Sequence, residues 1–273
     1  MGEPRDTDPM NLGNPAGARR TAPEGWGGGC DHFAAPLGSS TTGCLRFTNG
    51  AHRVIIRADL HLRGLYRARF GDRMPTICVQ GGIVAIRYPR VPFYAWRNHR
   101  SEGPAAEVAL NARVPWDVEI RGGASRLVAD LRGLRLGSFS LDGGASHLEV
   151  MLPAPSGTVA VVILGGASNV TLRRSTGVAA RLRVDGGATL LKFDDRSIGG
   201  AGGELDLRGR DYDGVADRYD ITITGGVNNV SVTDSEQQQA RARGVGVSAE
   251  PAQQARSDVS IRKEGADLDW EGK

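Results

Sequence analysis

Apolar residues recur along the middle of the chain with two superimposed periods. Between residues 115 and 234 they alternate with polar residues in short runs, which is the period of a strand with one buried face. Paired glycines separate these runs. The pairs begin at residues 122, 143, 165 and 186, so the steps are 21, 22 and 21 residues. A fixed step in this range indicates a repeat architecture.

Aligning the repeats on the first glycine of each pair gives four columns in which every residue is apolar. The positions two and four before the glycine are Ile120, Leu141, Ile163, Val184 and Ile223, and Val118, Phe139, Val161, Leu182 and Ile221. The positions five and seven after it are Leu127, Leu148, Val170, Leu191 and Val230, and Ala129, Val150, Leu172, Phe193 and Val232. One repeat cannot bury these side chains alone, so neighbouring repeats must stack.

This pattern predicts an all-β fold. A coil of about 21 residues is too short for two strands and a covering helix, and it fits two or three short strands joined by corners. We expect a parallel β-solenoid, and we expect it to be right-handed because parallel crossovers within one sheet almost always are.

The paired glycines are predicted to form the corners, where the chain turns sharply and stacked neighbours leave no room for a side chain. The expected corner residues are Gly81, Gly82, Gly122, Gly123, Gly143, Gly144, Gly165, Gly166, Gly186, Gly187, Gly225 and Gly226. Asn49-Gly50 is expected to take the same place in the first coil, which begins near Cys44. A phosphate-binding loop is not expected, because such a loop opens a helix and these pairs lie between strand patterns.

Residues 89–106 interrupt the periodicity with three prolines and are interpreted as a loop inserted in one coil. The loop concentrates aromatic and arginine side chains, which are enriched at binding hot spots. The candidate partner-binding residues are Arg90, Phe93, Tyr94, Trp96, Arg97 and Arg100. The alternative is that the loop folds back as a flap over the side of the solenoid, and the two interpretations are compatible.

The remaining segments define the expected domain organisation. Residues 1–43 are interpreted as a disordered arm, residues 44–234 as the solenoid, and residues 235–273 as a mostly disordered tail that could cap one end. Within the solenoid, residues 61–73 are expected to form a long loop, and the glycine-rich residues 198–203 are expected to bend away from the stack.

Two clusters have metal-ligand residue types without the spacing of a known site. Cys30 and His32 with Cys44 lack a second close ligand pair, so we favour a tail without metal. Asp211, Asp213 and Asp217 surround Gly214, but they do not follow the EF-hand spacing, so we favour an acidic turn over a calcium loop. No cofactor, metal site or catalytic constellation is predicted.

Composition constrains the partners and the compartment. The formal net charge of +3 is too near neutral to indicate a nucleic-acid partner. The chain has no apolar run long enough for a transmembrane helix and no apolar segment typical of a secretion signal, and its three cysteines do not suggest a disulfide framework. We therefore expect a cytoplasmic protein without a membrane partner.

The recurring Gly-Gly-Ala-Ser motif, followed by short alternating strands, resembles the adhesin-like, toast-rack group of bacterial β-helices. The resemblance covers residues 115–234, and residues 45–88 more loosely. It implies a right-handed β-helix without known catalysis and, in some members, a link to cell-envelope stress sensing. The missing membrane segment and export signal disfavour an adhesin or membrane-sensor role here.

Three functions remain as hypotheses. A non-enzymatic scaffold or interaction module, with a protein partner or self-association, is favoured by the regular core and the aromatic loop. A polysaccharide lyase-like enzyme needs a row of carboxylates on one face, and the row of Glu119, Asp142 and Asp185 is interrupted by Leu164 and Thr224. Nucleic-acid binding through the arginines is disfavoured by the low net charge.

Overall fold

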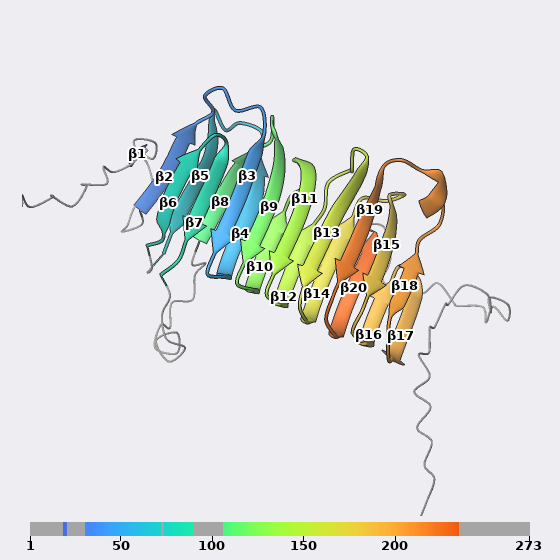
Figure 1. Cartoon of the computed structure of the whole chain (residues 1–273). Coiled ribbons are helices and arrows are strands. Elements are labelled where there is room, and N and C mark those ends of the chain that lie inside the picture. The colour runs from blue at the N-terminus through green and yellow to red at the C-terminus, as the bar shows by residue number, and fades with distance from the viewer. Residues whose placement is uncertain (1–18, 21–30, 72–73, 90–105, 235–273) are drawn as a thin grey trace, which may run out of the picture.

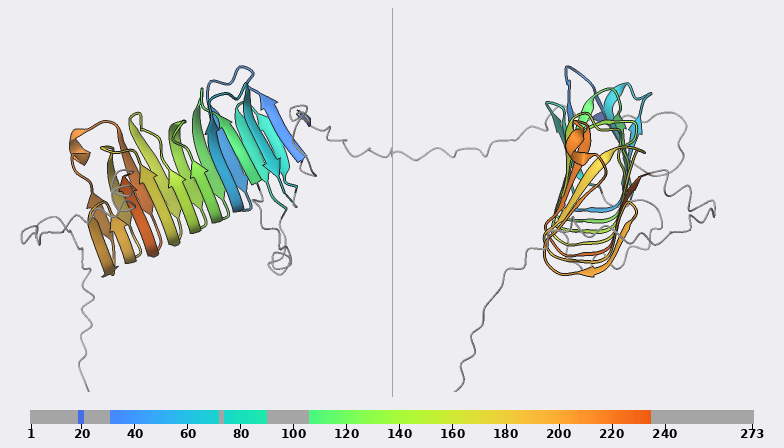
Figure 2. Two further views of the ribbon diagram at one scale, coloured as in Figure 1. Left: turned by 180° about the vertical axis from the view of Figure 1, so that it is seen from behind. Right: turned by 90° about the vertical axis from the view of Figure 1, so that its right-hand side faces the viewer.

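The computed structural model describes residues 19–20, 31–71, 74–89 and 106–234. They form two facing mixed β-sheets, one with eleven strands and one with nine, and the core lies between the sheets (Figures 1 and 2). The view along the stack in Figure 2 shows the sheets as opposite walls joined by turns. The predicted all-β class is confirmed.

The central strands pass alternately from one sheet to the other. In the nine-stranded sheet they are β3 (Gly43–Thr48), β7 (Ile83–Arg87), β9 (Pro115–Arg121), β11 (Arg135–Asp142), β13 (Thr158–Leu164), β15 (Ala179–Val184) and β19 (Arg218–Ile223). In the eleven-stranded sheet they are β4 (Ala51–Asp59), β8 (Ala106–Asn111), β10 (Ala124–Asp130), β12 (Ala145–Met151), β14 (Ala167–Arg174), β16 (Ala188–Phe193) and β20 (Val227–Asp234). Neighbours within each of these two sets pair in parallel.

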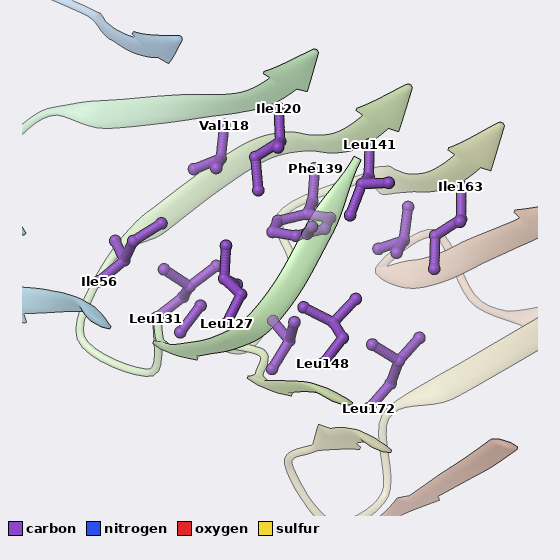
Figure 3. Close-up of a cluster of buried hydrophobic side chains, with 14 of the residues drawn as sticks. Ile56, Val118, Ile120, Leu127, Leu131, Phe139, Leu141, Leu148, Ile163 and Leu172 are labelled. Carbon is purple, nitrogen blue, oxygen red and sulfur yellow. The ribbon is translucent and has the colours of Figure 1, made fainter. Parts of the chain in front are cut away.

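The predicted apolar columns lie in register across these strands. Leu127 pairs with Leu148, and Leu148 pairs with Val170, all at most 1% exposed. Ile120, Leu141 and Ile163 form the matching column of the opposite sheet. Figure 3 shows side chains from both columns pointing toward one another between the sheets. This burial is the main favourable contribution to stability.

The order of the strands differs from the order of the chain at both ends of the stack. β20 lies between β14 and β16, and β19 lies between β13 and β15. In the same way, β4 lies between β8 and β10, and β3 lies between β7 and β9. The strands β3 and β4 near the start and β19 and β20 at the end of the described chain are therefore interior layers, with β7, β8, β15 and β16 outside them.

Antiparallel strands cover the two ends of the stack, and several of them were missed by sequence reasoning. One end carries β1 (Arg19–Arg20), β2 (Asp31–Pro36), β5 (Gly64–Phe70) and β6 (Thr76–Gln80); the other carries β17 (Arg196–Ala201) and β18 (Leu205–Arg208). Residues 31–36 of the predicted arm are thus a strand. Residues 64–70 of the predicted loop are a strand that buries Tyr66 and Phe70, and the glycine-rich residues 198–201 belong to β17.

Candidate functional site

The glycine pairs lie where the chain passes from the nine-stranded to the eleven-stranded sheet. At Gly143 the backbone has φ 120°, and a Cβ atom would lie 2.6 Å from the backbone nitrogen of Gly123 in the neighbouring coil. Both amides of the pair, at Gly143 and Gly144, donate to the carbonyl of Leu164, at 2.9 and 3.1 Å. The corners are thus joined along the stack by backbone hydrogen bonds.

Gly81 and Gly82 differ from the other pairs. They form the two-residue turn of the β6–β7 hairpin, within one sheet, and both have positive φ, at 55° and 82°. This is the conformation of a type I′ turn, which glycine favours at both positions. The prediction of a coil corner here is wrong, because the alternating residues on either side fold back on each other as a hairpin.

A column of left-handed residues runs beside the corners and was missed by the sequence analysis. Arg53, Arg126, His147, Asn169, Asn229 and Leu190 have φ between 50° and 54°. Each occupies the third position after its glycine pair, or after Asn49-Gly50 in the case of Arg53. The spacing of apolar residues in the sequence contained a signal for this column. Ala124 and Leu127, which are both buried, are three residues apart, whereas a regular strand buries every second residue.

A hollow of about 720 Å³ follows the row of corners across four adjacent coils. Its lining is Asn49, Gly50, Ala51, His52, Gly122, Gly123, Ala124, Ser125, Gly143, Gly144, Ala145, Ser146 and Gly166. Because adjacent strands are about 4.8 Å apart, four coils span about 14 Å along the stack. We call this hollow the corner groove.

Positive charge gathers at the β4–β10 end of the corner groove. His52 lines the groove, and its pKa is lowered from the usual 6.5 by burial and then by the charges of Arg53 and Arg126. Arg126 stands opposite Arg53, since Ser125 pairs with His52 and Leu127 pairs with Val54. His52 is therefore held toward its neutral form beside two arginines.

The strands β9 and β11 end at Arg121 and Asp142, which directly precede lining residues of the corner groove, and β7, which β3 separates from β9, ends at Arg87. Arg87 and Arg121 are exposed and both flank Thr48 in register. Arg121 contacts Glu119 at 3.2 Å, and Glu119 also binds Arg46 at 2.7 Å. Asp142 is an exposed carboxylate in the same register as Arg121.

The six candidate residues of the 89–106 loop, from Arg90 to Arg100, lie outside the described residues. The backbone at their N-terminal boundary is described. Tyr88 is buried, its amide donates to the Thr48 carbonyl at 3.2 Å, and its carbonyl accepts from Asn49 Nδ2 at 2.7 Å. At the other boundary, Ala106 is 1% exposed. Both boundaries are thus fixed to the stack.

The described residues do not bring together a carboxylate row. Asp142 and Asp185 lie in one column of the nine-stranded sheet, but Leu164 and Thr224 stand between them. Glu119 is engaged by Arg46, which is the first cause that lowers the pKa of this carboxyl. The arrangement does not resemble the paired, close carboxylates that acid–base cleavage of polysaccharides requires.

Residues of the two candidate metal clusters make other contacts in the structure. Asp213 pairs with Arg208 at 3.0 Å, while Asp217 accepts a hydrogen bond from the Gly157 amide at 2.6 Å. Cys44 contacts Glu119, and burial raises the pKa of its thiol, while Cys30 lies outside the described residues. In the described ranges, no group of three or more His, Cys, Asp or Glu residues could hold a metal ion.

Comparisons with known proteins support the architecture. Residues 82–173 match the family model of the N-terminal domain of toast_rack, so the toast-rack resemblance is confirmed for this part of the chain. The fold is similar to the crystal structure of a protein from Clostridium sporogenes ATCC 15579 that is provisionally named a cell adhesion protein. The TM-score is 0.59 at 15% identity, over 76% of this chain and 99% of that one.

A comparison with curated proteins gives no match. Among the described residues, no helix has the length and apolar character needed to cross a membrane.

Proposed function

We propose that this chain, which carries a toast-rack N-terminal domain at residues 82–173, is a non-enzymatic interaction module. Its stacked strands serve as a rigid frame, and the 89–106 insertion presents the contact residues to a protein partner. The observation that supports this most is the anchoring of the insertion at Tyr88 and Ala106, which are both buried in the stack. Because both ends of the insertion are fixed, the insertion loses less conformational entropy when it binds a partner.

We also infer that the central coils wind as a right-handed parallel solenoid with a repeat of about 21 residues. The parallel pairing of β9, β11 and β13 and of β10, β12 and β14 supports this winding. The hand follows from the general preference of parallel crossovers. The provisional name of the similar Clostridium protein agrees with an interaction role, although 15% identity supports the fold alone.

Partner capture tests the proposed function. The variant replaces residues 92–100 by a Gly/Ser segment of equal length, and in-cell crosslinking with mass spectrometry compares its partners with those of the native chain. We expect the native partner to be lost, because Phe93, Tyr94, Trp96, Arg97 and Arg100 are removed. The control replaces the exposed β17 residues Arg196 and Ser197 by alanine and should keep the partner.

Retention of the same partner by the loop variant, with an unchanged circular dichroism spectrum, would contradict the proposal. Loss of the partner in both variants would also count against it, because the contact would then not depend on the insertion. We further propose a cytoplasmic location, which cell fractionation with native-level expression tests directly.

A further inference from the structure

One end of the stack is level and presents two open strand edges. Among the described residues, β17 pairs only with β16 and β18 only with β15, so each is the last strand of its sheet (Figure 1). β15 and β16 belong to one coil, and residues 202–204 join β17 to β18. Both sheets therefore stop at the same layer, which we call the end layer.

The opposite end of the stack is uneven. There β6 is the last strand of the nine-stranded sheet, whereas β2 and β1 extend the eleven-stranded sheet beyond β5. A second stack that continued the sheet from β6 would meet these projecting strands. In the described part of the chain, no strand projects beyond the end layer, so both sheets can be continued together there.

Two apolar residues stand at the same height in the end layer. Ile198 precedes Gly202 by four residues, and Leu207 follows Gly203 by four, so both lie equally far from the turn that joins their strands. Ile198 is half-buried and packs against the core, and Leu207 is buried in it. The margin of the core thus reaches the open edge in both sheets.

The ladder between β15 and β18 leaves the backbone groups of Asp206 and Arg208 at the open edge. The Gly209 amide donates to the Ala180 carbonyl at 2.8 Å, so the backbone groups of Leu207, two residues earlier, also face β15. Alternate residues of an antiparallel strand direct their N–H and C=O groups to opposite sides. Those of Asp206 and Arg208 therefore point away from β15.

In β17 the open edge belongs to Ser197 and Gly199. Phe193 and Arg196 are register partners on either side of the two-residue turn of the β16–β17 hairpin, so their backbone groups pair with each other. By the same alternation, the groups of Ile198 face β16 and those of Ser197 and Gly199 face outward. Residues 197–201 contain no charge and no proline, which commonly protect an exposed edge. This edge is suited to accept another strand.

The charges of β18 are complementary to those of a second copy of β18. When identical strands pair in antiparallel fashion, opposed side chains share a face only if the two-fold axis passes through a residue. An axis at Leu207 places Asp206 opposite Arg208 of the second copy, at two symmetry-related positions. An axis at Asp206 would instead oppose two carboxylates, which destabilises a sheet.

Both charged groups can make this contact without leaving a buried charge unpaired. Arg208 contacts Asp213 at 3.0 Å, but the carboxylate of that pair is 74% exposed, and exposed pairs contribute little. Asp206 binds Arg181 at 2.9 and 2.6 Å, and its two oxygens have further lone pairs. Asp206 can thus hold Arg181 and a second arginine together.

The same axis suits β17. Because Ile198 is level with Leu207, an axis perpendicular to the sheets passes through both residues. It places Ser197 opposite Gly199 of the second copy, and these are the two residues whose backbone groups face outward. The outward groups of both strands therefore find partners at once, and each Ile198 is covered by its counterpart.

We propose that two copies of this chain bind each other through β17 and β18, with a two-fold axis through Ile198 and Leu207. Both sheets and the core then continue from one copy into the other. The occupant is a second copy because the backbone groups, charges and apolar positions of the end layer are complementary to themselves about this one axis. The contact uses no residue of the 89–106 insertion, so it does not depend on the proposed function.

Sedimentation equilibrium of the full chain tests the association. We expect a monomer–dimer equilibrium, with amide exchange at Ser197, Gly199, Asp206 and Arg208 that slows as the dimer forms. Arg208→Glu places carboxylates opposite each other at two positions and should weaken the dimer roughly tenfold or more. Arg208→Lys keeps the charge and should retain the dimer. The control is Arg113→Glu, an exposed arginine between β8 and β9, which should leave the dissociation constant unchanged.

Cysteine crosslinking tests the register, in chains with Cys30, Cys44 and Cys78 replaced by serine. Ser197→Cys in one copy should lie about 5.5 Å from Gly199→Cys in the other, within the range of about 4.4–6.8 Å for disulfides. Two copies of the same variant place their cysteines diagonally, about 7–8 Å apart. Oxidation of an equimolar mixture should therefore give a covalent heterodimer, and oxidation of either variant alone should not link two chains.

A chain that stays monomeric overturns the proposal. Concentration-independent protection of the β17 and β18 amides in such a monomer would assign the edge to residues 235–273 of the same chain. Equal weakening by Arg208→Glu and Arg113→Glu also overturns it, as does a dimer that gives no disulfide in the cysteine mixture. The insertion variant of the previous section keeps β17 and β18, so failure of one proposal is distinguishable from failure of the other.

Discussion

At the scale of single residues, the corner glycines are fixed by two separate requirements that the structure distinguishes. Gly143 combines positive φ with close approach of the neighbouring coil. At Gly225 the φ angle is not positive, but a Cβ atom would lie 2.5 Å from the Gly165 carbonyl carbon. Gly157 has φ 75° in open space. Conformation and crowding can therefore be tested independently.

Substituting these glycines by alanine should separate the two requirements. We expect Gly143→Ala to lower the free energy of unfolding by roughly 2–4 kcal/mol, because strain and crowding act together. Gly225→Ala should cost a comparable amount through crowding alone, and Gly157→Ala only about 1 kcal/mol through its left-handed backbone. Urea unfolding followed by circular dichroism measures all three.

Gly199→Ala is the control, since it has neither positive φ nor any atom within 4 Å of the added Cβ. It should change the free energy of unfolding by less than about 0.5 kcal/mol. A cost for Gly143→Ala as small as that of the control would show that the corners do not stack as described.

At the scale of elements, an ion pair holds the β16–β17 turn to the end of β14. Arg174, only 5% exposed, contacts Asp194 at 2.6 Å, and its Nε donates to the Val178 carbonyl at 2.6 Å. Phe193 lies 5.9 Å from the same guanidinium. Because β20 separates β14 from β16, this contact bridges two strand intervals and fixes the covering hairpin.

Removing the carboxylate should therefore loosen that end of the stack. Asp194→Asn keeps a residue that accepts φ 53° but leaves the Arg174 charge buried without its partner. We expect a loss of about 3 kcal/mol in the free energy of unfolding and faster amide exchange in β16 and β17. Asp213→Asn, which breaks an exposed pair with Arg208, should cost less than about 1 kcal/mol. Equal costs for the two variants would mean that burial does not strengthen the Arg174 pair.

The elements also show which parts of the fold can be read from the sequence. The columns containing Leu127 and Leu148 were predictable because apolar spacing and glycine pairs are local signals. The covering strand β5 was not, because arginines interrupt its four apolar residues, which therefore resemble an exposed loop until β2 and β8 pair with the strand. The corner groove was also missed, because its lining unites residues 49–52 with residues 122–125, 143–146 and 166, which are far from them in sequence.

At the scale of the whole molecule, the order of the coils is the feature that the sequence leaves open. The strands after each glycine pair carry the same apolar spacing, so β16 and β20 are equally suited to pair with β14. The hairpins of β17 and β18 allow the chain to pass around the end and return inward. As a result, β19 and β20 are interior layers, and the last described strand, β20, is paired on both sides, with β14 and β16.

Cysteine crosslinking tests this order most directly, in a background with Cys30, Cys44 and Cys78 replaced by serine. Thr171 and Ser231 are register partners about 4.8 Å apart, within the 4.4–6.8 Å range of disulfides, whereas Thr171 and Lys192 are separated by β20 and lie about 10 Å apart. Oxidation should link the T171C/S231C pair and leave T171C/K192C reduced. A disulfide in T171C/K192C, with none in T171C/S231C, would contradict the stack of coils described for this protein.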